Sequence, residues 1–380
     1  MKIKTLDDIK GSLKDKRILL RIDLNSQIIE NKVQNNPRFK AHSETIKLLI
    51  KKKAKLVVLA HQSNPNEKDF MSLKQHSEIL NKYVKIKFVN DIIGKKALEE
   101  IKRLKNGEAL LLNNVRFLSE EFDVLTKKNK LIETLFPLFD YYINDAFSIM
   151  HRNQASIVLF PKKIESFIGP VAEKELNNIE KLKSKLKKCT FILGGKKAED
   201  VIFLINQNNI LTTGILSLFV LKAKGYKLGY EDNLLKNIDL IKSINVNIKN
   251  IKYPTDLAIK LNNSRKELPI DELPVNSEIL DIGSKTINSY KKEIKKAKAI
   301  FIKGAPGDLD QEGFEIGTKE LLKAISKSKA FSIVSGGSLS DAIERFKIKK
   351  KLFSYVSLSG GALIYYLAKR KLPGLEALKR

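Results

Sequence analysis

The stretch KLVVLAH (55–61) directly follows HSETIKLLIKKKA (42–54), and the two stretches differ in hydrophobic period. In the earlier stretch apolar residues recur at helical spacing, which predicts an amphipathic helix. The later stretch is a short apolar run of the kind found in strands buried on both faces. A helix leading directly into a buried strand indicates the β-α-β rhythm of a parallel sheet with helices on both faces.

This alternation continues along almost the whole chain, and the second half repeats the rhythm without repeating the sequence. We therefore predict an α/β fold of two doubly wound, Rossmann-like parallel-sheet domains joined by a helical hinge. The segment 230–280 is less regular and is expected to form short strands and turns. The expected strands are RILLRIDL (17–24), KLVVLAH (55–61), KIKFV (85–89), EALLL (108–112), YYIND (141–145), CTFILGG (189–195), NILTTG (209–214), KAIFIKG (298–304), AFSIVSGG (330–337) and FSYVSLSGG (353–361).

Length and composition limit the kinds of protein to which this chain can belong. A chain of 380 residues suits two α/β domains, and a hydrophobic content of 43% is sufficient for two cores. The single cysteine, Cys189, excludes a disulfide framework and a cysteine-based zinc site, and it fits a reducing compartment. No apolar stretch is long enough for a membrane span or has the form of a secretory signal. We expect a cytoplasmic protein.

The formal net charge of +28 could indicate nucleic acid, an acidic membrane surface or anionic small substrates as partners. The lysines, however, are dispersed over helix-like segments, for example KLKSKLKK (181–188) and KKEIKKAK (291–298), where they are expected to be solvated. The sequence contains no recognisable nucleic-acid motif. We therefore do not expect nucleic acid or a membrane as the main partner.

Strands in the second half end in glycines and pass directly into helices. Ligands of open parallel sheets bind outside the carboxyl ends of the strands, where glycine lets backbone N–H groups approach a phosphate and a helix N-terminus adds free donors. Neither G-x-G-x-x-G nor the P-loop motif occurs, so the turns predict a phosphate or nucleotide platform of another type. Lys197 could reach a phosphate there, or it could be a solvated lysine at a helix start. The turns contain Gly194 and Gly195, Gly304 and Gly307, Gly336 and Gly337, and Gly360 and Gly361.

Strand ends in the first half carry acids, histidines and arginines. Arginine is scarce in this lysine-rich chain, and its planar fork suits phosphate and carboxylate oxygens. Each arginine could instead pair with a nearby acid, as Arg116 could with Glu120 or Glu121. If they converge on one sheet edge, they form an anion pocket. The residues are Asp23, Asn25, Arg38, His61, Arg116 and, in the loop NDAFSIMHRNQAS (144–156), Asp145, His151 and Arg152.

With these residues in this order, the chain resembles phosphoglycerate kinases, most closely their archaeal branch. The resemblance covers essentially the whole chain and is carried, in order, by LLRIDLN, NNPRFKAHSETI, VVLAHQSNP, LLNNVRF, INDAFSIMHRNQAS, ILGGKKAED, ILDIGSKTI, SGGSLSDAIERF and VSLSGGALIYYLAKRKLPGLEAL. It implies reversible transfer of the acyl phosphate of 1,3-bisphosphoglycerate to Mg-ADP, which gives 3-phosphoglycerate and ATP. The implied domains are 1–170 for phosphoglycerate, 171–188 as hinge helix, 189–362 for the nucleotide, and 363–380 returning to the first domain.

The resemblance also implies roles for individual residues. Arg38 is expected to stabilise charge on the transferring phosphoryl group and the substrate carboxylate, and Lys197 to neutralise the terminal phosphate of the nucleotide. We expect Asp145 to brace its loop rather than touch substrate. The remaining implied substrate-binding residues are Arg116, Arg152 and His61 at the distal phosphate and Asp23 and Asn25 at the hydroxyl side. The remaining implied nucleotide-binding residues are Gly194, Gly195, Gly304, Asp310, Gly336, Gly337 and Ser338.

The chain departs from the family pattern mainly in loops expected to hold phosphates and metal. The family's HLGRP reads HQSNP, so Asn64 replaces a phosphate-binding arginine; one lost charge-assisted contact costs about 1.5–3 kcal/mol. Mg²⁺ is implied with ATP or ADP, but the usual magnesium-binding acid is absent and its ligand stays unassigned. The other departures are Lys303 for asparagine, Asp310 for a ribose-binding glutamate, and Ser335, Ser338, Leu339, Leu358 and Ser359.

Two alternatives remain open from the sequence. The chain could be a divergent paralogue with the same fold and impaired phosphoryl transfer, or a basic protein that uses this scaffold to bind RNA or another polyanion. The family resemblance favours the kinase, with 3-phosphoglycerate or 1,3-bisphosphoglycerate and ADP or ATP as ligands. We expect a monomer or a weak homo-oligomer.

Overall fold

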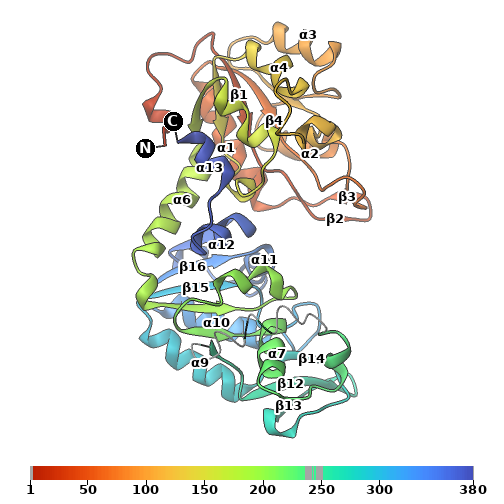
Figure 1. The fold of residues 1–380 in the computed structure, drawn as a ribbon, viewed down its shortest axis with the longest axis vertical. Coiled ribbons are helices and arrows are strands. Elements are labelled where there is room, and N and C mark those ends of the chain that lie inside the picture. Colours follow the sequence, from red (N-terminus) through yellow and green to blue (C-terminus); the bar gives the residue numbers. More distant parts are fainter. Residues whose placement is uncertain (1–2, 236–241, 243, 245–250, 380) are drawn as a thin grey trace. The chain divides into compact units, whose positions relative to one another are not determined.

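The computed structural model describes residues 3–235, 242, 244 and 251–379. The chain divides into two compact units (Figure 1): unit 1 comprises Met1–Asn177 and Arg370–Arg380, and unit 2 comprises Asn178–Lys369. The boundary falls within helix α6 (Pro170–Lys183), and helix α13 (Pro373–Leu378) belongs to unit 1. Among the described residues, no helix is long and apolar enough to cross a membrane.

Unit 1 is built on one parallel sheet of six strands in the order β5-β6-β4-β1-β7-β8. All neighbouring pairs in this sheet are parallel, which requires crossover connections between strands. The strands are β1 (Arg17–Arg21), β4 (Lys55–Leu59), β5 (Lys87–Val89), β6 (Ala109–Leu112), β7 (Tyr141–Asn144) and β8 (Glu165–Ile168). The other elements are a β2 (Ile28–Ile29) and β3 (Lys32–Val33) hairpin, and helices α1 (Pro37–Lys51), α2 (Lys74–Leu80), α3 (Lys95–Arg103), α4 (Lys130–Leu135) and α5 (Ala155–Val158).

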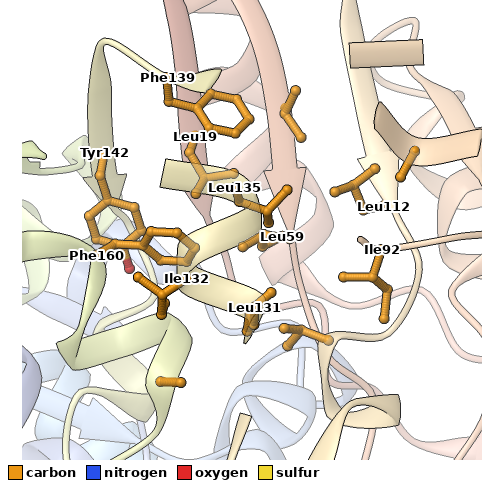
Figure 2. Packing of buried hydrophobic residues seen from close by; sticks show 14 of the residues in the cluster. Leu19, Leu59, Ile92, Leu112, Leu131, Ile132, Leu135, Phe139, Tyr142 and Phe160 are labelled. Atoms are coloured by element: carbon orange, nitrogen blue, oxygen red, sulfur yellow. The ribbon is translucent and has the colours of Figure 1, made fainter. Parts of the chain in front are cut away.

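Both faces of the unit 1 sheet are buried. Successive strand side chains point to opposite sides, and helices pack against each side. In β1, Leu19 packs in one core together with residues of α3, α4 and α5. Its neighbours Ile18 and Leu20 pack in the other core with residues of α1 and α2. Figure 2 shows the first of these cores, in which Leu131, Ile132 and Leu135 of α4 lie among strand residues such as Leu19 and Leu59.

Unit 2 repeats this plan with a parallel sheet in the order β11-β10-β9-β15-β16-β17. Ile300 and Ile302 face a core formed with α9, α10 and α11, whereas Phe301, on the opposite face, packs on Phe191 with ring centroids 5.8 Å apart. The strands are β9 (Cys189–Leu193), β10 (Ile210–Thr212), β11 (Ile251–Lys252), β15 (Ala299–Lys303), β16 (Phe331–Ser335) and β17 (Tyr355–Ser357). The helices are α7 (Gly214–Ala223), α9 (Ser284–Lys296), α10 (Ile316–Lys327), α11 (Gly337–Arg345) and α12 (Gly361–Leu367).

A small antiparallel sheet in the order β13-β12-β14 supplements unit 2. Its strands, β12 (Asp256–Leu261), β13 (Ser264–Pro269) and β14 (Ile279–Ile282), lie in the segment predicted to form short strands and turns. Of that segment, residues 236–241, 243 and 245–250 lie outside the described residues. The predicted fold class is confirmed. The edge strand β8 was not foreseen, and β11 lies within the segment that was expected to form short strands and turns without being specified.

Candidate active site

Helix α1 begins so that Arg38 lies in its first turn. Asn36 caps the helix by accepting a hydrogen bond from the Arg38 amide at 2.9 Å, and Pro37 occupies the first helical position, which its fixed φ favours. The Arg38 guanidinium then donates to the carbonyl oxygen of Asn25 at 2.8 Å, and its Nε lies 3.4 Å from Asp23 Oδ2. Arg38 is therefore directed at the loop that follows β1.

Asp23 is a buried carboxylate that the surrounding groups keep ionised. Burial alone would raise its pKa, but Arg38, His61, the hydroxyl of Ser148 and the backbone N–H of Asn25 together lower the pKa well below its ordinary value. Ser148 donates to Asp23 Oδ2, and the Asn25 amide donates to Oδ1 at 2.9 Å. Asp23 thus links the β1 loop, α1 and the loop after β7.

Arg116 lies buried after β6 in the short 3-10 helix η2 (Val115–Phe117). Its Nη1 donates to the carbonyl oxygen of Ser63 at 2.6 Å and to Asn64 Oδ1 at 2.8 Å, and its Nη2 donates to Gln154 at 3.1 Å. These hydrogen bonds do not go to Glu120 or Glu121, the alternative that the sequence left open. Asn64, which replaces a family arginine, therefore orients Arg116. Burial and the Arg21 charge lower the pKa of Arg116 to about 10, so it stays cationic near neutral pH.

Arg21 is fully buried next to His61 and forms hydrogen bonds with several neighbouring groups. It donates to Ser156 at 3.0 Å and to the carbonyl oxygen of Ile22 at 2.6 Å, and its Nη2 lies 3.3 Å from His61 Nδ1. Glu121, also fully buried, accepts hydrogen bonds from the Ser156 hydroxyl and amide at 2.7 and 2.9 Å and lies 4.0 Å from Arg21. The Arg21 charge is thus compensated through Ser156 and Glu121.

The contact with Arg21 determines the state of His61. An arginine can only donate, so His61 Nδ1 must accept, and the ring proton is on Nε2. Burial, and then the charges of Arg21 and Arg116, lower the pKa of His61 well below 6.5. His61 is therefore a neutral hydrogen-bond donor through Nε2 rather than a cation.

We predict that ¹⁵N-detected NMR of the imidazole rings will show His61 as the Nε2–H tautomer. Because its pKa is lowered well below 6.5, its resonances should not shift towards those of imidazolium as the pH falls from 8 through 6.5. A His61→Gln variant, in which one of the four histidine signals is lost, assigns the resonance. Protonation of His61 near pH 6.5 would contradict the prediction.

The loop after β7 contributes Arg152 and His151. Arg152 is exposed, yet its charge is close enough to lower the pKa of Arg116. Burial and then Arg152 lower the pKa of His151 to about 4, so this histidine is also neutral near pH 7. Unit 1 therefore brings Asp23, Asn25, Arg38, His61, Arg116 and Arg152 to one edge of its sheet.

Asp145 in the same loop holds helices in place, as expected. It accepts hydrogen bonds from Thr45 of α1 at 2.7 Å and from the Val171 amide at the start of α6 at 2.7 Å. His42 Nδ1 lies 3.1 Å from the same carboxylate. With its partners inside the fold, Asp145 is a structural residue.

In unit 2, the turns after β9, β10 and β15 are joined to one another by backbone hydrogen bonds. The Gly194 amide donates to the carbonyl oxygen of Lys303 at 2.9 Å, and the Gly195 amide to that of Ala305 at 3.1 Å. Gly304 has φ of 82°, and a Cβ there would lie 2.1 Å from the carbonyl oxygen of Gly194, so only glycine fits. These turns form one backbone platform at the carboxyl edge of the sheet.

Lysines and acids surround this platform. Lys196 pairs with Asp310 at 2.9 Å and with Asp308 at 3.3 Å. Lys197 is exposed directly before the 3-10 helix η8 (Ala198–Asp200). The Lys303 ammonium reaches the turn of Gly336, where a Cβ would lie 3.1 Å from Lys303 Nζ. Lys303, which departs from the family pattern, thus adds positive charge at this edge, whereas the charge of Lys196 is paired with Asp308 and Asp310.

Three of the departures, Ser335, Leu339 and Ser359, have buried side chains in unit 2. Leu339 is fully buried in the core beside α9 and α10. Ser335, also buried, donates to the carbonyl oxygen of Ser359 at 2.9 Å and so links the turns after β16 and β17. Gly337 and Ser338, in contrast, are exposed in the first turn of α11.

Comparisons with known proteins agree with this arrangement. A sequence model of the family "Phosphoglycerate kinase" matches residues 6–370. The phosphoglycerate kinase of Methanothermus fervidus is 37% identical, with 100% of this chain and 97% of the relative covered, and that of Methanobacterium bryantii is 38% identical, with 98% and 96% covered.

Two solved structures resemble this chain over nearly its whole length. The crystal structure of phosphoglycerate kinase from Pyrococcus horikoshii OT3 matches with a TM-score of 0.92 at 31% identity, covering 99% of this chain and 98% of that chain. The structure of phosphoglycerate kinase from Coxiella burnetii matches with a TM-score of 0.77 at 27% identity, covering 99% of each chain. Because the similarity extends over practically the whole length in sequence and in fold, this chain belongs to the phosphoglycerate kinase family.

Proposed function

We propose that this protein catalyses reversible transfer of the acyl phosphate of 1,3-bisphosphoglycerate to Mg-ADP, which gives 3-phosphoglycerate and ATP. It is a phosphotransferase with a carboxyl group as acceptor (EC 2.7.2.3), as its family membership implies. The family relationship over nearly the whole chain does not favour the two alternatives, a paralogue with impaired transfer and a polyanion-binding protein.

The observation that carries the proposal is the convergence of Arg38, Arg116 and His61 at one sheet edge in unit 1. Phosphoryl transfer requires positioning and positive charge around the moving group more than covalent participation by the protein. We assign phosphoglycerate to unit 1. Arg38 would stabilise charge on the phosphoryl group and the substrate carboxylate. The distal phosphate would contact Arg116, Arg152 and the Nε2–H of His61, while Asp23 and Asn25 would bind the hydroxyl side.

We assign the nucleotide to unit 2. The amides of Gly194 and Gly195 are bonded within the platform, so the backbone donors to phosphate oxygens would come mainly from the start of α11, since helix N-termini carry free donors and a favourable dipole. Lys197 would neutralise the terminal phosphate, with Lys303 as a second cation. Asp310 would reach the ribose once it leaves Lys196. The phosphate-binding turns would be those of Gly194, Gly195, Gly304, Gly336, Gly337 and Ser338.

Mg²⁺ would enter with the nucleotide. In the part of the chain that the structure describes, no group of three or more His, Cys, Asp or Glu side chains could hold a metal ion. Mg²⁺ usually keeps several waters and takes one or two carboxylates plus substrate phosphates, so a site without a protein cage fits it. Asp308, which lies 3.3 Å from Lys196, is a carboxylate at the phosphate edge that could take part in such a site, and the ion would neutralise phosphate charge there.

A coupled assay of purified protein with ATP, Mg²⁺ and 3-phosphoglycerate tests the proposal. ADP formation that depends on 3-phosphoglycerate is expected, and its absence at saturating substrates would refute the activity. RNA binding without such turnover, lost steeply between low and moderate salt, would instead support the polyanion-binding alternative. The proposal also includes a cytoplasmic location, consistent with the reduced, buried Cys189, and a monomer or weak homo-oligomer.

We predict that Asn64→Arg tightens 3-phosphoglycerate binding. The new cation adds one charge-assisted contact, worth about 1.5–3 kcal/mol, or roughly ten- to a hundredfold in Kd. The hydrogen bonds from Arg116 to Ser63 and Gln154 do not involve the Asn64 side chain, so we expect them to persist in the variant. Isothermal titration calorimetry measures the change, with Asn64→Ala as the matched control that removes the amide without adding charge. Unchanged or weaker binding by Asn64→Arg would contradict the prediction.

A further inference from the structure

The loop between β15 and α10 is hydrogen-bonded to the small antiparallel sheet of unit 2. This loop, residues 304–315, contains Gly304 and Asp310, both assigned above to the nucleotide. The Asp308 amide donates to the carbonyl oxygen of Leu280 in β14 at 2.8 Å, and the Gly307 amide donates to Thr318 Oγ1 in α10 at 3.1 Å. The conformation of the loop therefore depends on groups that lie outside the phosphate platform.

Arg265 of β13 makes a set of directed contacts with this region. Its Nη1 donates to Asp281 Oδ2 at 2.8 Å and to the carbonyl oxygen of Gly313 in the loop at 3.0 Å. Its Nη2 donates to the carbonyl oxygen of Ile282 at 2.9 Å and to Glu267 at 2.8 Å. The side chain is 12% exposed. A planar fork with several fixed donors joins β13, β14 and the loop in a way that a lysine cannot reproduce.

The side chain of Asp281 in β14 lies close to the backbone at both ends of the loop. Its side chain is fully buried, and Oδ2 also accepts from the amide of Gly317 at 2.7 Å. A Cβ on Gly307 would lie 2.4 Å from the Asp281 carboxyl carbon, and a Cβ on Gly317 would lie 2.2 Å from Oδ1. The backbone thus approaches Asp281 closely before and after the loop. Removing Arg265 would leave the Asp281 carboxylate buried without its cation, whereas Arg265 without Asp281 would keep its contact with Glu267.

We propose that Arg265 and Asp281 act as a positioning pair that fixes loop 304–315 and thereby sets the affinity of the protein for the adenine nucleotide. Neither residue is assigned contact with the reacting atoms. The inference rests on the proposed function, because it takes this loop as part of the nucleotide site. It predicts that weakening the pair affects nucleotide affinity and leaves phosphoglycerate affinity, which depends on unit 1, unchanged.

The test uses Arg265→Met in the full chain. We expect the KM for Mg-ATP and the Kd for ADP, measured by calorimetry, to rise about tenfold or more, the effect of losing one charge-assisted hydrogen bond. The KM for 3-phosphoglycerate should stay within about twofold of the parent. Arg265→Lys, which keeps the charge and part of the hydrogen bonding, should give an intermediate value. Lys266→Met, at the exposed neighbouring position of the same strand, is the matched control and should behave like the parent.

The outcomes separate the inference from the proposed function. If Arg265→Met binds ADP as the parent does, or if both KM values rise equally, the positioning role is wrong. If Arg265→Met does not fold, Arg265→Lys decides by hydrogen–deuterium exchange: faster exchange confined to the loop, with weaker ADP binding, supports the pair, and unchanged exchange overturns it. Failure of the proposed function would appear in the parent protein, as absence of 3-phosphoglycerate-dependent turnover, before any variant is compared.

Discussion

Replacing Arg38 by alanine is expected to reduce turnover by about a thousandfold or more while 3-phosphoglycerate binding stays measurable. An arginine that stabilises charge on a transferring phosphoryl group contributes about 10³–10⁵ to turnover. Arg38 reaches the loop after β1 through Asn25 and Asp23, and its side chain is 26% exposed, so it is available to a ligand. Arg116 and His61 remain in the variant to bind the anion. Steady-state turnover in the coupled assay and the Kd from calorimetry separate the two effects.

Two further variants define this experiment. Lys40→Ala removes an exposed cation two positions further along the same helix and should leave turnover unchanged. Arg38→Lys keeps the charge without the planar fork and should recover only part of the activity. Full turnover by Arg38→Ala would refute the role assigned to Arg38.

Glu121→Ala is expected to destabilise unit 1 by about 3–5 kcal/mol, the usual cost of removing one partner from a buried ionic pair. Arg21 has no exposed surface, and the carboxylate of Glu121 compensates it directly at 4.0 Å and through Ser156. Hydrogen exchange of the β1 amides, followed by mass spectrometry, reports the unfolding free energy of unit 1 separately from that of unit 2.

The control for this prediction is the neighbouring Glu120→Ala, which should change stability by less than about 0.5 kcal/mol. In the double variant Arg21→Met with Glu121→Leu, both charges are gone, and most of the lost stability should return, since apolar replacement of a buried pair is often neutral. A Glu121→Ala protein as stable as the parent would show that the Arg21 charge is compensated elsewhere.

The spacing of apolar residues along the sequence predicted the fold well, because this spacing depends directly on which side chains are buried. The run around Val57 and Val58 identified β4, and the alternating segments gave the order of strands and helices in both units. Strand β8 escaped detection because it begins with the polar residues Glu165 and Ser166 and has only two buried apolar residues, Phe167 and Ile168. Strand β11 comprises only Ile251–Lys252, which is too short for a hydrophobic period to be recognised.

Scarcity of arginine in the sequence singled out Arg38 and Arg116 as candidates, and the structure places Arg116 after β6 but Arg38 in the first turn of α1 rather than in a loop. Arg21 was missed although it interrupts an apolar strand, a position where a charge needs a buried partner. That partner, Glu121, is 100 residues away in the sequence, and no local pattern connects the two. The same holds for Asn64, whose role as acceptor for Arg116 depends on the folded loop.

Helix α13 has a consequence for synthesis of the protein. Its Gly374 amide donates to the carbonyl oxygen of Met150 at 2.9 Å, and Leu375 and Leu378 are buried in unit 1. The ribosome produces all of unit 2 before it reaches these residues. During translation, therefore, unit 1 lacks these contacts until unit 2 has been made, and the apolar surface that Leu375 and Leu378 cover stays exposed during that time.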